Sequence, residues 1–138
     1  MNVRLLSLSL LAATGLAGCG ASEPPPPPAA PPTEVAAVKT PPPQYPMELA
    51  CTGVGGTSTF KVTIGTDGKP SEVALLAGAG NAQLDDLART AVLGWEFKAA
   101  TRNGQAVPAT IQVPISFNPP QPKPDQCFAI EERMRRGG

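Results

Sequence analysis

The stretch from Ala91 to Phe117 constrains the fold more than any other part of the chain. It reads AVLGWEFKAATRNGQAVPATIQVPISF. The aromatic pair Trp95 and Phe97 follows an apolar helical pattern, and the turn signal Asn103-Gly104 leads into a run in which apolar and polar residues alternate. The stretch therefore predicts the end of a helix, a turn and a half-buried strand, with both aromatic rings in a core.

A second segment, Thr57 to Ala77, predicts a β-hairpin. Residues 58–64 and 73–77 alternate in the same way, and Asp67-Gly68 between them favours a tight turn. Asn81 is a good N-cap for a following helix, in which Arg89 is expected on the polar side. The apolar residues of that helix recur at helical spacing and are Leu84, Leu87, Ala88, Ala91, Val92 and Trp95.

Pro114 indicates where the last strand lies in the sheet. A proline has no N–H to donate to a central strand, so it is confined to edges and bulges. The alternating run from Ile111 to Phe117 is therefore expected at an edge, where another chain could pair with it.

The rest of the chain is dominated by proline. Eighteen of the 138 residues are prolines, clustered at 24–28, 31–32, 41–43 and 119–124. Such runs form extended polyproline II rather than a core. Residues 19–43 are therefore expected to be an anchor and tether, 44–118 a single small domain, and 119–138 a proline-rich tail.

Charge and composition exclude several functions. Eleven basic residues balance eleven acidic residues, so no positive field attracts nucleic acid. The chain has no His, which removes the usual general base and the commonest metal ligand. Asp85 and Asp86 are better explained as partners of the helix dipole than as catalytic groups. We expect no enzyme, no metal and no cofactor.

Residues 1–18 resemble an export signal, with Arg4 preceding a leucine-rich run that is too short to span a bilayer. Leu16-Ala17-Gly18-Cys19 resembles the lipobox of bacterial lipoproteins, which implies cleavage before Cys19 and lipidation of that residue. An ordinary signal peptide with an incidental cysteine is the alternative. Gly20, rather than Asp, after the cysteine implies the outer membrane in preference to the inner one.

The remaining cysteines, Cys51 and Cys127, bracket the predicted domain. In an oxidising periplasm an even pair is expected to form a disulfide. Two reactive thiols are the alternative, although no CxxC motif or His partner accompanies them.

The ordered motifs from residue 44 to residue 117 resemble the C-terminal domain of TonB-type energy transducers. They are Gln44-Tyr45-Pro46, the strand–Asp67-Gly68–strand hairpin, Leu84-Asp85, Trp95-x-Phe97-x-x-Ala100, Asn103-Gly104 and Val113-Pro114-x-x-Phe117. The resemblance implies an α+β fold with the order α-β-β-α-β, in which a three-stranded antiparallel sheet packs on a helix.

That family binds an extended peptide, the TonB box of an outer-membrane receptor, as a strand added beside its third strand. By position, the resemblance implies partner-binding residues at Gln44, Tyr45, Pro46, Ile111, Gln112, Val113, Ser116 and Phe117. The expected function is a periplasmic, lipid-anchored module that docks outer-membrane transport receptors. A structural envelope lipoprotein, whose tail covers the edge strand, is the alternative. The sequence does not specify the oligomeric state.

Overall fold

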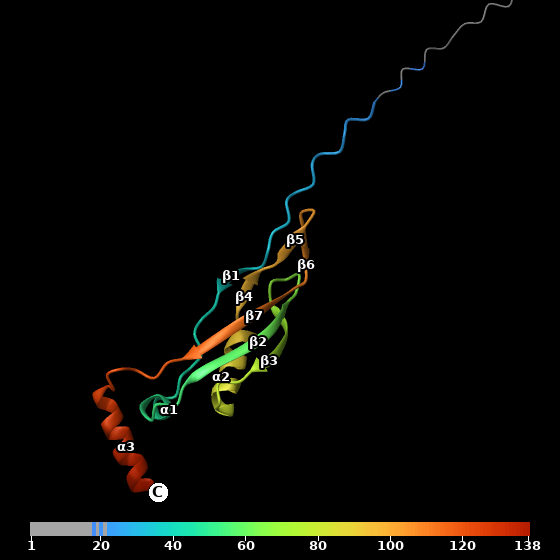
Figure 1. Ribbon diagram of the computed structural model, residues 1–138. Helices are drawn as coiled ribbons and strands as arrows, with labels where there is room; N and C mark the ends of the chain where they lie inside the picture. The colour runs from blue at the N-terminus through green and yellow to red at the C-terminus, as the bar shows by residue number, and fades with distance from the viewer. Residues whose placement is uncertain (1–17, 19, 21) are drawn as a thin grey trace, which may run out of the picture.

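The computed structural model describes residues 18, 20 and 22–138 (Figure 1). Apart from Gly18, the predicted signal peptide lies outside the described residues, and so does the predicted lipidation site at Cys19. In the part of the chain that is described, no helix has the length and apolar character needed to cross a bilayer.

The described chain forms three helices and seven strands. Their bounds are β1 Ala36–Lys39, α1 Met47–Cys51, β2 Gly56–Ile64, β3 Pro70–Ala77, α2 Ala82–Leu93, β4 Glu96–Lys98, β5 Ala100–Arg102, β6 Gln105–Val107, β7 Ala109–Phe117 and α3 Asp125–Gly137.

The main sheet has three antiparallel strands in the order β3-β2-β7. The predicted α+β fold, with a three-stranded antiparallel sheet and helices, is confirmed. Two smaller antiparallel pairs, β1–β4 and β5–β6, accompany it. The sequence predicts no strand in residues 19–43 and only a turn at Asn103-Gly104, so these pairs are additions to the expected order.

The core lies between the main sheet and α2. The sheet has one buried and one polar face because strands turn successive side chains to opposite sides. In β2 the buried positions are Ser58, Phe60, Val62 and Ile64, as the alternation predicts. Leu84, Ala88 and Val92 of α2, with Phe97 and the odd-numbered residues 113–117 of β7, complete the cluster.

Asp85 joins α2 to the sheet. Its Oδ1 accepts hydrogen bonds from Ser58 Oγ at 2.6 Å and from the backbone N–H of Ala79 at 2.8 Å. Ser58 is fully buried, so this acceptor satisfies a hydroxyl that water cannot reach. Asn81 caps the helix as predicted, accepting from the N–H groups of Gln83 and Leu84. Asp85 is therefore a structural anchor as well as a dipole partner.

The expectation for Trp95 is met in part, and the expectation for Arg89 was wrong. The helix ends at Leu93 with Gly94 as its C-cap. Trp95, just beyond it, is half-buried against the core cluster, and its Nε1 donates to the carbonyl of Pro41 at 2.8 Å. Arg89 does not point to solvent: its Nη1 donates to the carbonyl of Val73 at 2.6 Å, and its guanidinium lies 5.7 Å from the centre of the Phe60 ring. A long side chain can place its stem on apolar surface and its head on a polar group, which the helical pattern alone does not show.

Gly68 holds β4 against the hairpin. Its carbonyl accepts a hydrogen bond from the N–H of Phe97 at 2.8 Å, and a Cβ at this position would collide with the carbonyl of Phe97. With φ at 78°, Gly68 also needs the left-handed region. The Asp67-Gly68 turn therefore serves packing as well as chain reversal.

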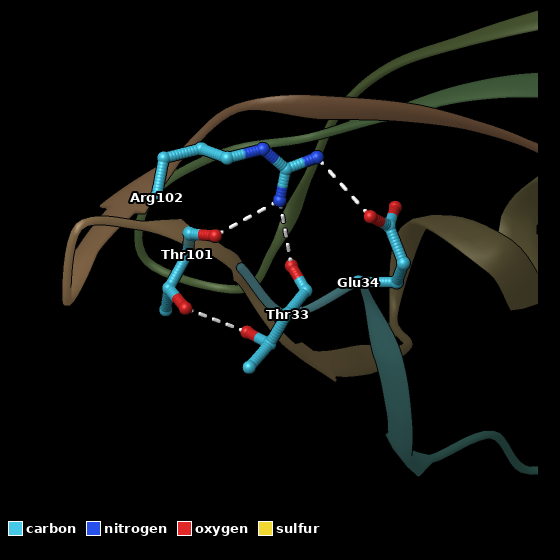
Figure 2. Close-up of polar contacts among 4 residues, drawn as sticks. All are labelled: Thr33, Glu34, Thr101 and Arg102. Carbon is cyan, nitrogen blue, oxygen red and sulfur yellow. Dashed lines mark hydrogen bonds and ion pairs between the residues drawn. The ribbon is translucent and has the colours of Figure 1, made fainter. Parts of the chain in front are cut away.

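The end of the expected tether is attached to the domain. β1 pairs with β4, and Thr33 and Thr101 exchange two backbone hydrogen bonds of 3.0 Å. Figure 2 shows the side chains that reinforce this contact: the two threonine hydroxyls lie 2.7 Å apart, and Arg102 binds Glu34 at 3.1 Å. The extended chain leaves the domain beside β5 and β6 (Figure 1).

Cys51 and Cys127 form a disulfide, as the sequence predicts. Their Cα atoms lie 5.1 Å apart, and both residues are fully buried. The bond fixes α3 to α1, at the end of the molecule opposite to the extended N-terminal segment (Figure 1).

Candidate functional site: the outer edge of β7

β7 lies at the edge of the main sheet, as Pro114 indicates. It pairs along its whole length with β2, from Ala109 opposite Ile64 to Phe117 opposite Gly56. In the described part of the chain, no other strand pairs with it. One side of its backbone is therefore committed to β2, and the other faces outward.

Arg89 reveals which residues face outward. Val73 is paired with Val62, and its carbonyl accepts a hydrogen bond from Arg89 of α2. From this contact we infer that the Val73 carbonyl points away from β2. In an antiparallel ladder, neighbouring residues direct their N–H and C=O groups to opposite sides of the strand. Val62 therefore directs its backbone groups toward β7, where it is opposite Ile111.

The neighbours of Ile111 then alternate in the same way. Residues 111, 113, 115 and 117 direct their backbone groups toward β2, and residues 110, 112, 114 and 116 direct theirs outward. The donors on the outer edge are the N–H groups of Thr110, Gln112 and Ser116, because Pro114 has none. All four outward residues offer a carbonyl. No hydrogen bond between described residues, apart from the pairing with β2, involves the backbone of β7.

The side chains of the expected site residues on β7 divide in two. Val113 and Phe117 are buried and Ile111 is half-buried, so these three hold the strand on the core. Gln112 and Ser116 are exposed on the polar face, and Ser116 Oγ lies 2.9 Å from Thr57 Oγ. The two groups were expected to act alike, but only the second directs its backbone outward.

The Gln44-Tyr45-Pro46 segment meets β7 at its C-terminal end. The Tyr45 ring packs edge-on against Phe117 with 5.3 Å between ring centres. Its hydroxyl donates to the carbonyl of Val54 at 2.6 Å. Burial raises the pKa of the Tyr45 hydroxyl above its usual value, because the site disfavours a phenolate. Tyr45 therefore braces the end of β7.

The other two residues of this segment have different surroundings. Pro46 precedes α1 and takes its N-cap position. Gln44 is exposed and lines a shallow apolar pocket between residues 41–44 and α2. The structure thus brings Tyr45 to β7 directly and places Gln44 beside α2.

The C-terminal tail does not pair with β7. α3 packs against α1 through the disulfide, and its ion pairs join Glu132 to Arg135 and Arg136 within the helix. Lys123, which precedes α3, pairs with Glu131. The outer edge is therefore left open by the described tail.

The chemistry available at this edge is main-chain hydrogen bonding. Over residues 18, 20 and 22–138, no three His, Cys, Asp or Glu side chains gather in a way that could hold a metal ion. An exposed row of N–H and C=O groups can instead pair with an extended peptide, and the peptide's backbone then supplies the affinity.

Comparison with known proteins identifies a matching family. The sequence profile described as "Gram-negative bacterial TonB protein C-terminal" matches residues 41–119. Protein tonB2 of Pseudomonas aeruginosa is 35% identical over 77 residues, which make up 56% of this chain and 28% of that protein. The chain therefore matches little more than a quarter of that relative's length.

A solved structure shares the fold. The solution NMR structure of Pseudomonas aeruginosa TonB CTD superimposes with a TM-score of 0.54 at 22% sequence identity. The superposition covers 62% of this chain and 87% of that one.

Proposed function

Because this chain belongs to the family of Gram-negative bacterial TonB protein C-terminal domains, which is non-enzymatic, we propose that it docks outer-membrane transport receptors. In this proposal the chain is a periplasmic binding module in TonB-dependent transport, held to a membrane by a lipid on Cys19. An extended segment of the receptor, the TonB box, adds to the main sheet as a strand beside β7.

One observation carries the proposal: the outward row of backbone groups on β7. Thr110, Gln112 and Ser116 each offer an N–H and a C=O, and Pro114 offers a C=O. A guest strand that lies along this row can form up to seven main-chain hydrogen bonds by this count of groups.

The expected site residues take different parts in this binding. Gln112 and Ser116 contact the guest through their backbone. Ile111, Val113 and Phe117 hold β7 in place by packing on the core, and Tyr45 braces its end. Pro46 lies next to Tyr45 in the chain and would meet a guest that extends past Phe117, whereas Gln44 lies beside α2.

The lipid anchor rests on sequence alone. The Leu16-Ala17-Gly18-Cys19 motif follows an apolar run directly, and Gly20 after the cysteine favours the outer membrane. With the tether attached at Thr33, residues 20–32 are the free spacer, with a reach of roughly 40 Å at about 3.1 Å per residue. This reach suits a module that works close to the membrane that holds it.

The alternative is a structural envelope lipoprotein that binds no guest. It requires the chain's own tail to cover β7. The packing of α3 on α1, away from the outward row, supports the binding module instead.

Peptide binding tests the proposal. The probe is a fluorescent ten-residue peptide copied from the TonB box of an outer-membrane receptor of the same bacterium. We expect binding at micromolar concentrations, and we expect Gln112→Pro to bind roughly fivefold more weakly than Gln112→Thr, since only the threonine keeps the outward N–H. Equal affinity of the two variants, or no binding of peptide or receptor by wild type, would refute it.

A further inference from the structure

Pro114 lies in the middle of the outward row. It is opposite Thr59 of β2, and its side chain is exposed on the polar face. Because its backbone faces outward, its missing N–H costs the β2–β7 ladder nothing. The missing N–H of Pro114 removes a hydrogen bond only from a strand that pairs with the outer edge of β7.

The two edges of the main sheet are protected differently. At the β3 edge, the β2–β3 register shifts at two irregularities, Pro70 and Glu72 lie on the strand, and Arg89 occupies the carbonyl of Val73. Bulges, prolines and charges are the usual means by which proteins keep an edge from pairing with other chains.

β7 has almost none of these protections. Its pairing with β2 is regular over nine residues, and its sequence ATIQVPISF contains no charged residue. Pro114 is the one feature of β7 that weakens its edge. A long, regular and uncharged edge is otherwise a site at which a second copy of the same chain would pair.

The missing N–H of Pro114 removes two hydrogen bonds from a pair formed by two copies of the chain. In a symmetric antiparallel pair of β7 strands, the outward residues face one another, for example Gln112 opposite Pro114 of the second copy and the reverse. Each copy contributes one proline, so two hydrogen bonds are lost. A guest strand that has no proline opposite this row loses only one.

We propose that Pro114 is a specificity-determining residue: it lets β7 accept an extended segment of another protein while it prevents two copies of this chain from pairing through their β7 edges. The guest half of this statement rests on the proposed function, and the second-copy half does not. One net hydrogen bond changes an equilibrium constant roughly fivefold and two change it roughly thirtyfold. Pro114 therefore weakens pairing of two copies roughly fivefold more than it weakens binding of a guest strand.

Pro114→Thr tests this inference, because threonine suits a strand and restores the outward N–H. Sedimentation equilibrium of the full chain in density-matched detergent measures self-association. We expect a monomeric wild type and a roughly thirtyfold tighter dimer for the variant. Lys61→Thr is the matched control and should stay monomeric. Lys61 lies on β2 opposite Gln112 and, like Pro114, is exposed on the polar face of the sheet.

A double variant shows whether any new dimer uses β7. Adding Gln112→Pro to Pro114→Thr removes one outward N–H while the other is restored, so self-association should fall back to that of wild type. A dimer that survives in the double variant uses another surface and contradicts the inference. The inference is also contradicted if the wild type already pairs through β7. It is contradicted as well if the Pro114→Thr variant folds but associates no more strongly than the wild type.

The same variant separates this inference from the proposed function. If wild type binds the TonB-box peptide, Pro114→Thr should bind it roughly fivefold more tightly, and unchanged or weaker binding contradicts the inference. If no peptide binds to either protein, the proposed function fails, and self-association alone decides whether Pro114 prevents pairing of two copies.

Discussion

The guanidinium of Arg89 donates a hydrogen bond to the carbonyl oxygen of Val73, with 2.6 Å between Nη1 and the oxygen. This contact crosses from α2 to the outer edge of β3 and occupies an acceptor there. The contact also indicates which way the backbone groups of β2 and β7 point. If the Val73 carbonyl points away from β2, then the N–H and C=O of its partner Val62 point toward β7. The sheet thus has one edge engaged by its own chain and one open edge.

Replacing Arg89 should lower the stability of the domain. Arg89→Ala removes a charged donor to a backbone carbonyl and a cation over the Phe60 ring, so we expect a loss of about 2 kcal/mol in the free energy of unfolding. Urea denaturation measures the loss. Arg136→Ala is the control, because Arg136 is exposed and makes only ion pairs within α3. An Arg89 loss no larger than that of the control would contradict the structural role.

Asp85 should matter more than its neighbour Asp86. Asp85→Ala leaves the fully buried Ser58 hydroxyl and the N–H of Ala79 without their acceptor, so the free energy of unfolding should fall by about 2–3 kcal/mol. Asp85→Asn keeps an acceptor oxygen and should lose less. Asp86→Ala, at an exposed position, should change stability by less than about 0.5 kcal/mol. Equal effects at positions 85 and 86 would show that both act only on the helix dipole.

The disulfide should make a large contribution to stability. It closes a loop with a sequence separation of 76 residues, so the double variant Cys51→Ser and Cys127→Ser should lose roughly 4 kcal/mol on the chain-entropy account. The oxidised chain should also run faster than the reduced chain on a denaturing gel. Identical mobility, together with two thiols that titrate after denaturation, would contradict the bond.

Alkaline pH should destabilise the fold through Tyr45. Burial raises the pKa of its hydroxyl above the usual value of 10.0, so the unfolded chain loses this proton at lower pH than the folded chain does. The contribution of Tyr45 is complete below the unfolded pKa, and it falls as the pH rises through the folded pKa. Tyr45 is the only tyrosine, so phenolate absorbance reports it directly. A midpoint at or below 10 in the folded protein would contradict the raised pKa of this half-buried residue.

Local pattern was sufficient to predict the sheet. The alternation at residues 58–64 and 111–117 reports burial on one face, and the structure shows that face against α2. Pro114 predicted an edge because the restriction comes from its own missing N–H. The Cys51–Cys127 pair could be predicted because only two cysteines remain beyond residue 19.

Contacts between distant segments could not be predicted in this way. All four residues of β1 are exposed, so its pairing with β4 depends on backbone hydrogen bonds that leave no periodic signal in the sequence. Trp95 has the spacing of a helical core residue, but the helix ends at Leu93 and its indole donates to Pro41, 54 residues away. The position of Arg89 over Phe60 likewise depends on the tertiary packing of α2.

The open edge was predicted from Pro114, but the individual binding residues were predicted by resemblance. The resemblance placed Ile111 and Gln112 together in one expected binding set. Only the register against β2 distinguishes a residue whose backbone is already used from one whose backbone is open. That register depends on pairing across more than 40 positions of the chain, between Val62 and Ile111.

Hydrogen exchange at single residues of β7 tests most directly whether a guest strand adds to this edge. The amides of Thr110, Gln112 and Ser116 should exchange fast in the free chain and become protected when saturating TonB-box peptide is present. The amides of Val113 and Ile115, already bonded to β2, should be protected in both states. Peptide that binds while the first three amides remain unprotected would contradict strand addition at β7.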